Sequence, residues 1–95
     1  MTKEQQFASV WDAIESSSEE AASLKARADV MTAVRGVVDT WKLTQSQAAK
    51  RLRISQPRLN DLLHGRIDKF SLDALVDLAV RAGLSVQVKT RRRAA

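Results

Sequence analysis

The sequence predicts an all-α bundle of about five helices that ends in one short β-strand. Apolar residues recur at helical spacing through most of the chain. Serine and threonine residues suited to helix N-caps precede several of these stretches, and glycines follow two of them. The last stretch instead alternates apolar and polar residues, with Leu84, Val86 and Val88 on one side, which is a strand pattern.

Three of the predicted helices are amphipathic segments, two in the first half of the chain and one in the second. The first covers residues 2–15, where one face of the helix carries Phe7, Val10, Trp11 and Ile14. A longer helix follows a serine-rich stretch and runs to Trp41. Another begins after Ser71 and ends at Gly83. Each has a single apolar face, which has to pack against another element.

A short helix is predicted after Thr44. Thr44 can cap it, and Gln47, three residues on, completes a capping box. This helix ends near Leu52. Only Arg53 and Ile54 separate it from the next cap, which leaves room for a tight turn but not for a long loop.

A second short helix follows the turn. Ser55 can cap it, Pro57 suits its first turn, and Gly65 ends it. Its leucines, including Leu59 and Leu62, form a buried stripe. Two short helices joined in this way have the layout of a helix-turn-helix, whose second helix lies in the major groove of DNA.

The second short helix carries polar residues on the side away from its leucines. Asparagine and glutamine can pair with adenine, and arginine with guanine, mainly from the first turn of such a helix. We therefore expect Gln56, Arg58 and Asn60 to read bases. Asp61 either accepts from a cytosine amine or pairs with Arg58. The alternative is that all of them are ordinary solvated residues.

Charge is divided unevenly along the chain. Residues 1–23 hold one lysine against five acidic residues, a net charge of −4, and residues 24–95 carry a net charge of +9. A net positive charge on residues 24–95 favours a partner that carries phosphate groups. No cysteine is present, no apolar run approaches the length of a membrane span, and we expect a cytoplasmic protein without membrane contact.

Enzymatic activity is not expected. The single histidine, His64, cannot make an ordinary zinc site without cysteine, so we predict no metal and no cofactor. The three glycines are too far apart for a phosphate-binding loop. The carboxylates show no evident pair for acid–base catalysis, and we predict no catalytic residues.

Several stretches resemble the XRE (phage Cro/repressor-like) helix-turn-helix family, and most closely its HigA-like antitoxin branch. The resemblance covers roughly residues 24–90. It is carried by Leu43-Thr44-Gln45, Ala48-Ala49, Ile54-Ser55-Gln56-Pro57-Arg58, Leu62-Leu63-His64-Gly65-Arg66 and Phe70-Ser71-Leu72-Asp73-Ala74-Leu75. It implies a bundle like that of lambda repressor, with residues 18–83 as the DNA-binding domain.

The resemblance also implies roles for residues around the two short helices. Gln45 would anchor a phosphate, and the groove would be faced by Ser55, Gln56, Pro57, Arg58, Asn60 and Asp61. We expect further contacts to the DNA backbone from Thr44, Lys50, Arg53, Ser55 and Arg66. Arg53 occupies the turn where the family most often has glycine. Either a left-handed backbone there costs roughly 1 kcal/mol, or the turn differs slightly.

Residues 84–95 are predicted to form a dimerisation strand and a basic tail. A lone strand leaves its backbone groups unpaired, and its simplest partner is the same strand of a second copy. We therefore expect a homodimer joined through Leu84, Val86 and Val88. The family resemblance likewise implies a dimer that reads a palindromic operator, with half-sites about one helical turn apart.

The antitoxin branch implies a protein partner. Its members bind and neutralise a RelE/HigB-like toxin that cleaves mRNA on the ribosome, and they repress their own operon. Residues 1–17 would form an acidic toxin-binding segment that docks through Phe7, Val10, Trp11 and Ile14. The alternative is that this helix packs on its own domain.

Two other functions remain open from the sequence. One is a stand-alone XRE-type regulator without a toxin. The other is an interaction module that no longer binds DNA. In the first case the protein would still associate with the nucleoid when bound to its operator.

Overall fold

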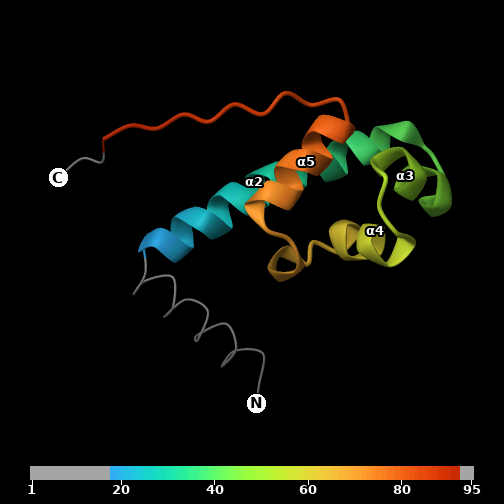
Figure 1. Cartoon of the computed structure of the whole chain (residues 1–95), viewed down its shortest axis with the longest axis horizontal. Helices are drawn as coiled ribbons and strands as arrows, with labels where there is room; N and C mark the ends of the chain where they lie inside the picture. The colour runs from blue at the N-terminus through green and yellow to red at the C-terminus, as the bar shows by residue number, and fades with distance from the viewer. Residues whose placement is uncertain (1–17, 93–95) are drawn as a thin grey trace, which may run out of the picture.

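The computed structural model describes residues 18–92 of the chain. These residues form α2 (Ser18–Trp41), α3 (Gln45–Leu52), α4 (Gln56–Leu63), the short 3-10 helix η1 (Ile67–Lys69) and α5 (Leu72–Arg81) (Figure 1). The all-α prediction is therefore confirmed for this part of the chain, with four α-helices rather than the five expected overall. The helix expected over residues 2–15 lies outside the described residues, as do its candidate toxin contacts.

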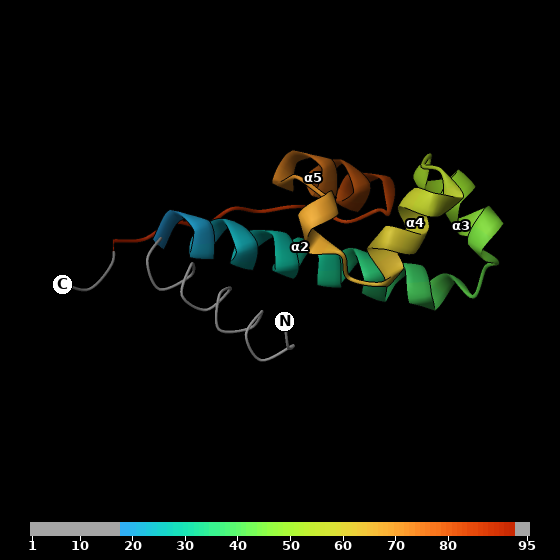
Figure 2. The same cartoon turned by 90° about the horizontal axis from the view of Figure 1, so that it is seen from below.

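The long helix α2 is the base on which the other helices lie. Figure 2 shows α5 along the middle of α2, and the α3–α4 pair over its C-terminal end. Arg27 of α2 reaches the chain between α4 and α5, where its Nη1 donates to the carbonyls of Ile67 at 3.4 Å and Phe70 at 3.5 Å. These bonds tie the segment that follows α4 to α2.

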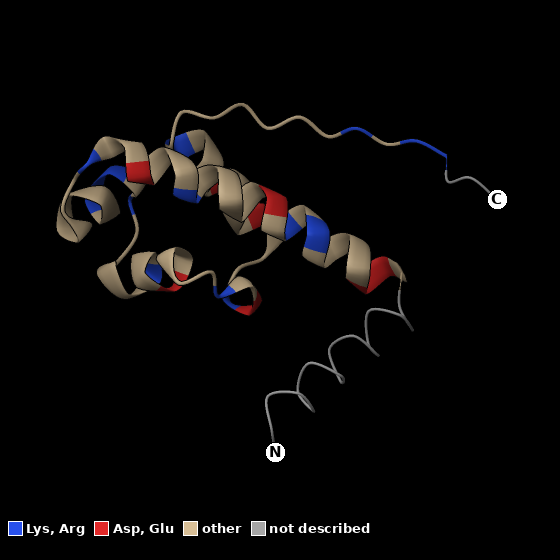
Figure 3. Cartoon of the chain, turned by 180° about the vertical axis from the view of Figure 1, so that it is seen from behind, with Lys and Arg blue, Asp and Glu red and all other residues tan. Residues whose placement is uncertain are grey.

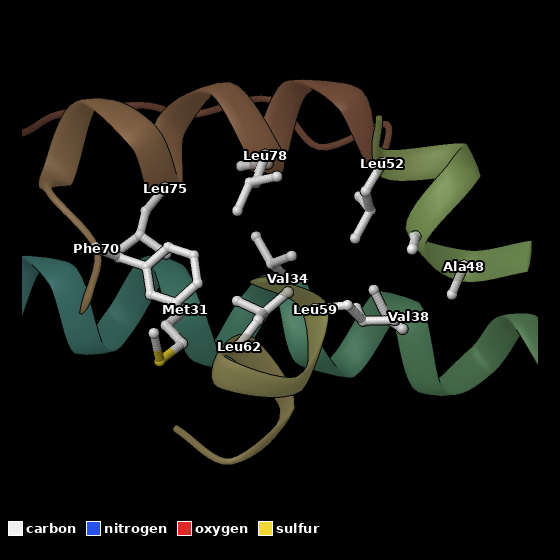
Figure 4. Close-up of a cluster of buried hydrophobic side chains, with 12 residues drawn as sticks. Met31, Val34, Val38, Ala48, Leu52, Leu59, Leu62, Phe70, Leu75 and Leu78 are labelled. Atoms are coloured by element: carbon white, nitrogen blue, oxygen red, sulfur yellow. The ribbon is translucent and has the colours of Figure 1, made fainter. Parts of the chain in front are cut away.

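One hydrophobic core joins all four α-helices (Figure 4). Each helix contributes two or three buried side chains, which is the pattern expected when every amphipathic face is turned inward. The buried residues are Met31, Val34 and Val38 of α2, Ala48, Ala49 and Leu52 of α3, Leu59 and Leu62 of α4, Phe70, and Leu75, Leu78 and Ala79 of α5.

The C-terminal segment is not a strand in the described residues, which corrects the prediction for residues 84–88. The segment instead runs back along α2 as an extended tail (Figure 1). Leu84 and Val86 are half-buried against the core, while Val88 is 84% exposed. The alternating pattern is used here to place two side chains on the protein's own helices, because no second strand lies beside the segment within residues 18–92.

Candidate nucleic-acid interface

The capping box at the start of α3 is confirmed. The Oγ1 of Thr44 accepts from the backbone N–H of Gln47 at 3.2 Å, and the Oε1 of Gln47 accepts from the N–H of Thr44 at 3.1 Å. These reciprocal bonds fix the entry to α3. They place Gln45, the first residue of the helix, in an exposed position.

The turn between α3 and α4 contains a left-handed residue. Arg53 has φ 59° and ψ 44°, and its N–H donates to the carbonyl of Lys50 at 3.1 Å. The Nη1 of Arg81 donates to the carbonyl of Leu52 at 3.2 Å and so ties the end of α3 to α5. Of the two alternatives left by the sequence, the left-handed turn is the one adopted. It leaves the side chain of Arg53 exposed.

Helix α4 begins as its sequence predicts. The Oγ of Ser55 accepts from the N–H of Arg58 at 3.2 Å, and Pro57 lies in the first turn. Leu59 and Leu62 are fully buried, which turns the opposite side of α4 outward. Gln56 and Pro57 are therefore exposed on that side.

The outward side of α4 also holds polar side chains that are less accessible. Asn60 and Asp61 are half-buried. The side-chain amide groups of Gln56 and Asn60 make no hydrogen bond within residues 18–92. These two amides are therefore available to a partner.

Arg58 lies differently from the other candidate base readers. Its Nη1 donates to the carbonyl of Lys69 at 2.8 Å, and its guanidinium carbon lies 4.2 Å from the centre of the Phe70 ring. The side chain is half-buried against the segment that joins α4 to α5. Its guanidinium thus lies against the protein's own chain, although the hydrogen bond to Lys69 is at the surface.

Asp61 and Arg66 form an ion pair at the end of α4. The Nη1 of Arg66 and the Oδ1 of Asp61 are 2.7 Å apart. The sequence had offered Arg58 as the partner of Asp61, three residues earlier. The partner is instead Arg66, because Gly65 with φ 68° reverses the chain beyond α4 and brings Arg66 back beside it.

The chain from the end of α2 to the first turn of α4 is strongly basic. Between Asp39 and Asp61 the sequence has no acidic residue, and it holds the cations Lys42, Lys50, Arg51, Arg53 and Arg58. Figure 3 shows basic residues on α3 and the turn beside it. All of these cations except Arg58 are exposed.

Arg51 is a cation that the sequence analysis left out. It lies in the last turn of α3, and its guanidinium carbon is 4.3 Å from the centre of the ring of Trp41, the last residue of α2. The signal available in the sequence was its position next to Lys50 in the same acid-free stretch.

A family model described as a helix-turn-helix domain matches residues 13–91 of the chain. The chain belongs to this helix-turn-helix family. A solved structure, described provisionally as an XRE family transcriptional regulator, is similar to it with a TM-score of 0.72 and 29% sequence identity. The similarity covers 80% of this chain and 90% of that one. No curated protein matches the chain.

In this helix-turn-helix protein, α3 is the first helix of the motif and α4 is the second. All but one of the exposed predicted contacts lie on one stretch of the chain, from the start of α3 through the turn to the start of α4. They are Thr44, Gln45, Lys50, Arg53, Ser55, Gln56 and Pro57, and the exception is Arg66, which lies beyond α4. Their roles at DNA stay predictions, as do those of Arg58, Asn60 and Asp61.

Two other kinds of site are absent from the described part of this helix-turn-helix protein. Residues 18–92 contain no group of three or more histidine and acidic side chains that could hold a metal ion. None of their helices has the length and apolar character needed to cross a lipid bilayer.

Proposed function

We propose that this protein is a sequence-specific double-stranded DNA-binding repressor of the XRE type. The observation that carries the proposal is the α3–turn–α4 unit, which is fixed by two side-chain caps and exposes the first turn of α4 beside a run of cations without carboxylates. The solved regulator that resembles the chain supports the same function.

The proposed binding mode assigns a different task to each helix. Helix α4 enters the major groove with its first turn toward the base edges. Helix α3 lies across the DNA backbone, where Gln45 and Lys50 contact phosphates. Arg53 contacts the backbone from the turn. These contacts to phosphate set register and affinity, and contacts from α4 supply specificity.

Binding to the DNA upstream of the protein's own coding sequence tests this function. We expect a complex that resists competition by unrelated duplexes and weakens steeply as salt rises. Lys50→Ala should weaken binding to every duplex and reduce the salt slope by about one unit. Lys25→Ala is the matched control, because Lys25 pairs with Asp29 on the far part of α2. Equal affinity for all duplexes would contradict sequence-specific repression.

The proposed function includes a homodimer on a palindromic operator. In residues 85–92 no backbone N–H or carbonyl takes part in a hydrogen bond within the described chain, whereas the N–H of Leu84 donates to Ala79 at 2.9 Å. Pairing of residues 84–88 with the same segment of a second copy would satisfy these groups. Sedimentation tests the idea: a chain truncated after Gly83 should be monomeric, and a dimer of that chain would exclude the pairing.

The proposed function also has a more specific form, in which the repressor is an antitoxin. The support is the HigA-like resemblance, together with the acidic charge and helical apolar spacing of residues 1–17. Phe7 and Trp11 would dock in a groove of a RelE/HigB-like toxin. Expression of the adjacent reading frame should arrest growth, and this chain should relieve the arrest. A chain lacking residues 1–17 should not.

The alternatives give different results in these experiments. If the adjacent reading frame causes no arrest, the protein is a stand-alone regulator. If, in addition, this protein binds no DNA sequence in preference to others, it is an interaction module.

A further inference from the structure

We propose that α4 reads A·T base pairs, because its side chains suited to G·C pairs are already engaged within the protein. This inference rests on the proposed DNA-binding function and names the class of sequence that the site recognises. It assigns Arg58 as a positioning residue and leaves base reading to Gln56 and Asn60.

The only arginine of α4 is held by the segment that follows the helix. Arg58 donates to the carbonyl of Lys69 at 2.8 Å and lies 4.2 Å from the ring centre of Phe70, which is 2% exposed. A hydrogen bond from a charged donor is stronger than one from a neutral donor, and the cation–π contact with Phe70 adds to it. To reach a guanine, Arg58 would have to give up both interactions.

The partner segment of Arg58 is itself anchored to α2. Arg27 of α2 donates to the carbonyls of Ile67 and Phe70, at 3.4 and 3.5 Å. Arg58 therefore connects the first turn of α4 through this segment to the long helix. Its structural task is to set the direction in which α4 projects from the bundle.

The side chain suited to cytosine is also engaged. Asp61 lies 2.7 Å from Arg66, and its side chain is 24% exposed. An Asp carboxylate could accept from the amine of cytosine, and an arginine could donate to guanine. Their mutual ion pair satisfies both charges, so neither is the best reader of a G·C pair.

The side chains that remain on the outward side of α4 suit A·T pairs. Gln56 is exposed, Asn60 is half-buried, and neither amide has a hydrogen-bond partner within residues 18–92. Glutamine and asparagine pair bidentately with adenine, and an apolar side chain such as Pro57 can contact the methyl group of thymine. Residues four apart share a helix face about 6 Å apart along the axis. This spacing corresponds to roughly two base-pair steps.

Selection from a pool of random-sequence duplexes with the full chain tests the inference. The enriched half-site should contain adenines at two positions a short distance apart. Gln56→Ala and Asn60→Ala should each remove the preference at one position and weaken the selected duplex by roughly 5- to 150-fold. Lys25→Ala, in the ion pair with Asp29 on α2, is the control and should change neither quantity.

Variants of Arg58 separate positioning from base reading. Arg58→Met should lower the melting temperature and weaken the selected and the unrelated duplexes by similar factors, without changing which bases are preferred. Arg58→Lys keeps a cation and should recover part of the stability, with the same base preferences. Because the selection also uses the unaltered chain, the inference can be tested even if Arg58→Met does not fold.

Two results would overturn the inference, and they differ. A guanine-containing half-site whose guanine preference is lost in Arg58→Met at unchanged melting temperature would show that Arg58 reads bases, and the proposed function would stand. If no duplex is enriched at all, sequence-specific DNA binding fails, and the inference fails with it.

Discussion

At the scale of single residues, side chains with similar sequence signals have different tasks. Gln56 and Arg58 lie two residues apart in the first turn of α4, yet one is exposed and the other is bound to Lys69 and Phe70. Sequence reasoning identified the helix and its polar side. It could not identify the engagement of Arg58, because the accepting carbonyl lies eleven residues further along the chain.

Arg53 allows a direct test of the turn. A non-glycine residue in the left-handed region costs about 1 kcal/mol or more. Glycine removes that cost, but it also increases the conformational entropy of the unfolded chain, which lowers stability by up to ~1 kcal/mol. We expect Arg53→Gly to change the free energy of unfolding by less than about 1 kcal/mol and Arg53→Val to lower it by more, since a β-branched residue is a poor fit at φ 59°. Chemical denaturation measures both.

The same pair of substitutions at Lys42, with φ 54°, is the control for the backbone effect. Arg53→Gly should in addition weaken DNA binding for all sequences, because a cation near the phosphates is lost. An Arg53→Val variant as stable as the unaltered chain would contradict the strained turn.

At the scale of helices, local signals determined most of what the structure contains. Side-chain caps at Thr44, Ser55 and Ser71 were readable from the sequence, and all three make the expected hydrogen bonds. These contacts span only three residues, so they depend little on the rest of the fold. The strand predicted over residues 84–88 is absent from the described single chain for the opposite reason. A strand depends on a distant partner, and the alternation of Leu84 and Val86 also suits packing on the protein's own core.

The capping box of α3 is expected to support both stability and binding. Thr44→Ala should lower the free energy of unfolding by about 0.5–2 kcal/mol, because the N–H of Gln47 loses its acceptor. It should also weaken DNA binding, since Gln45 follows the cap directly. Thermal denaturation and a binding titration measure the two effects. Ser46→Ala is the control, as Ser46 is exposed and makes no side-chain hydrogen bond within residues 18–92. Equal stability of the two variants would argue against the cap.

At the scale of the whole molecule, the C-terminal tail belongs partly to the core and partly to the surface. Leu84 and Val86 pack against α2 and α5, while Val88 is exposed. The core therefore extends past α5, the last helix. Charge is also distributed unevenly over the molecule. The stretch without acidic residues includes α3, the turn and the start of α4.

Truncation tests how much the tail contributes to folding. Removal of residues 84–95 should lower the free energy of unfolding by about 1–3 kcal/mol, because two half-buried apolar side chains are lost. Removal of residues 88–95 keeps Leu84 and Val86 and should have a small effect. Urea denaturation at several protein concentrations measures this contribution and detects any dimer. If the two truncated chains are equally stable, the packing of Leu84 and Val86 does not contribute.

DNA binding by the surface formed by α3, the turn and α4 can be tested directly. The measurement is a titration of the isotopically labelled chain with the selected duplex, in which the shift of every backbone amide is followed by nuclear magnetic resonance. We expect the largest shifts between Thr44 and Asn60, at the start of α3, in the turn and in the first turn of α4. Shifts concentrated on α5 and the N-terminal half of α2, with α4 unchanged, would contradict it.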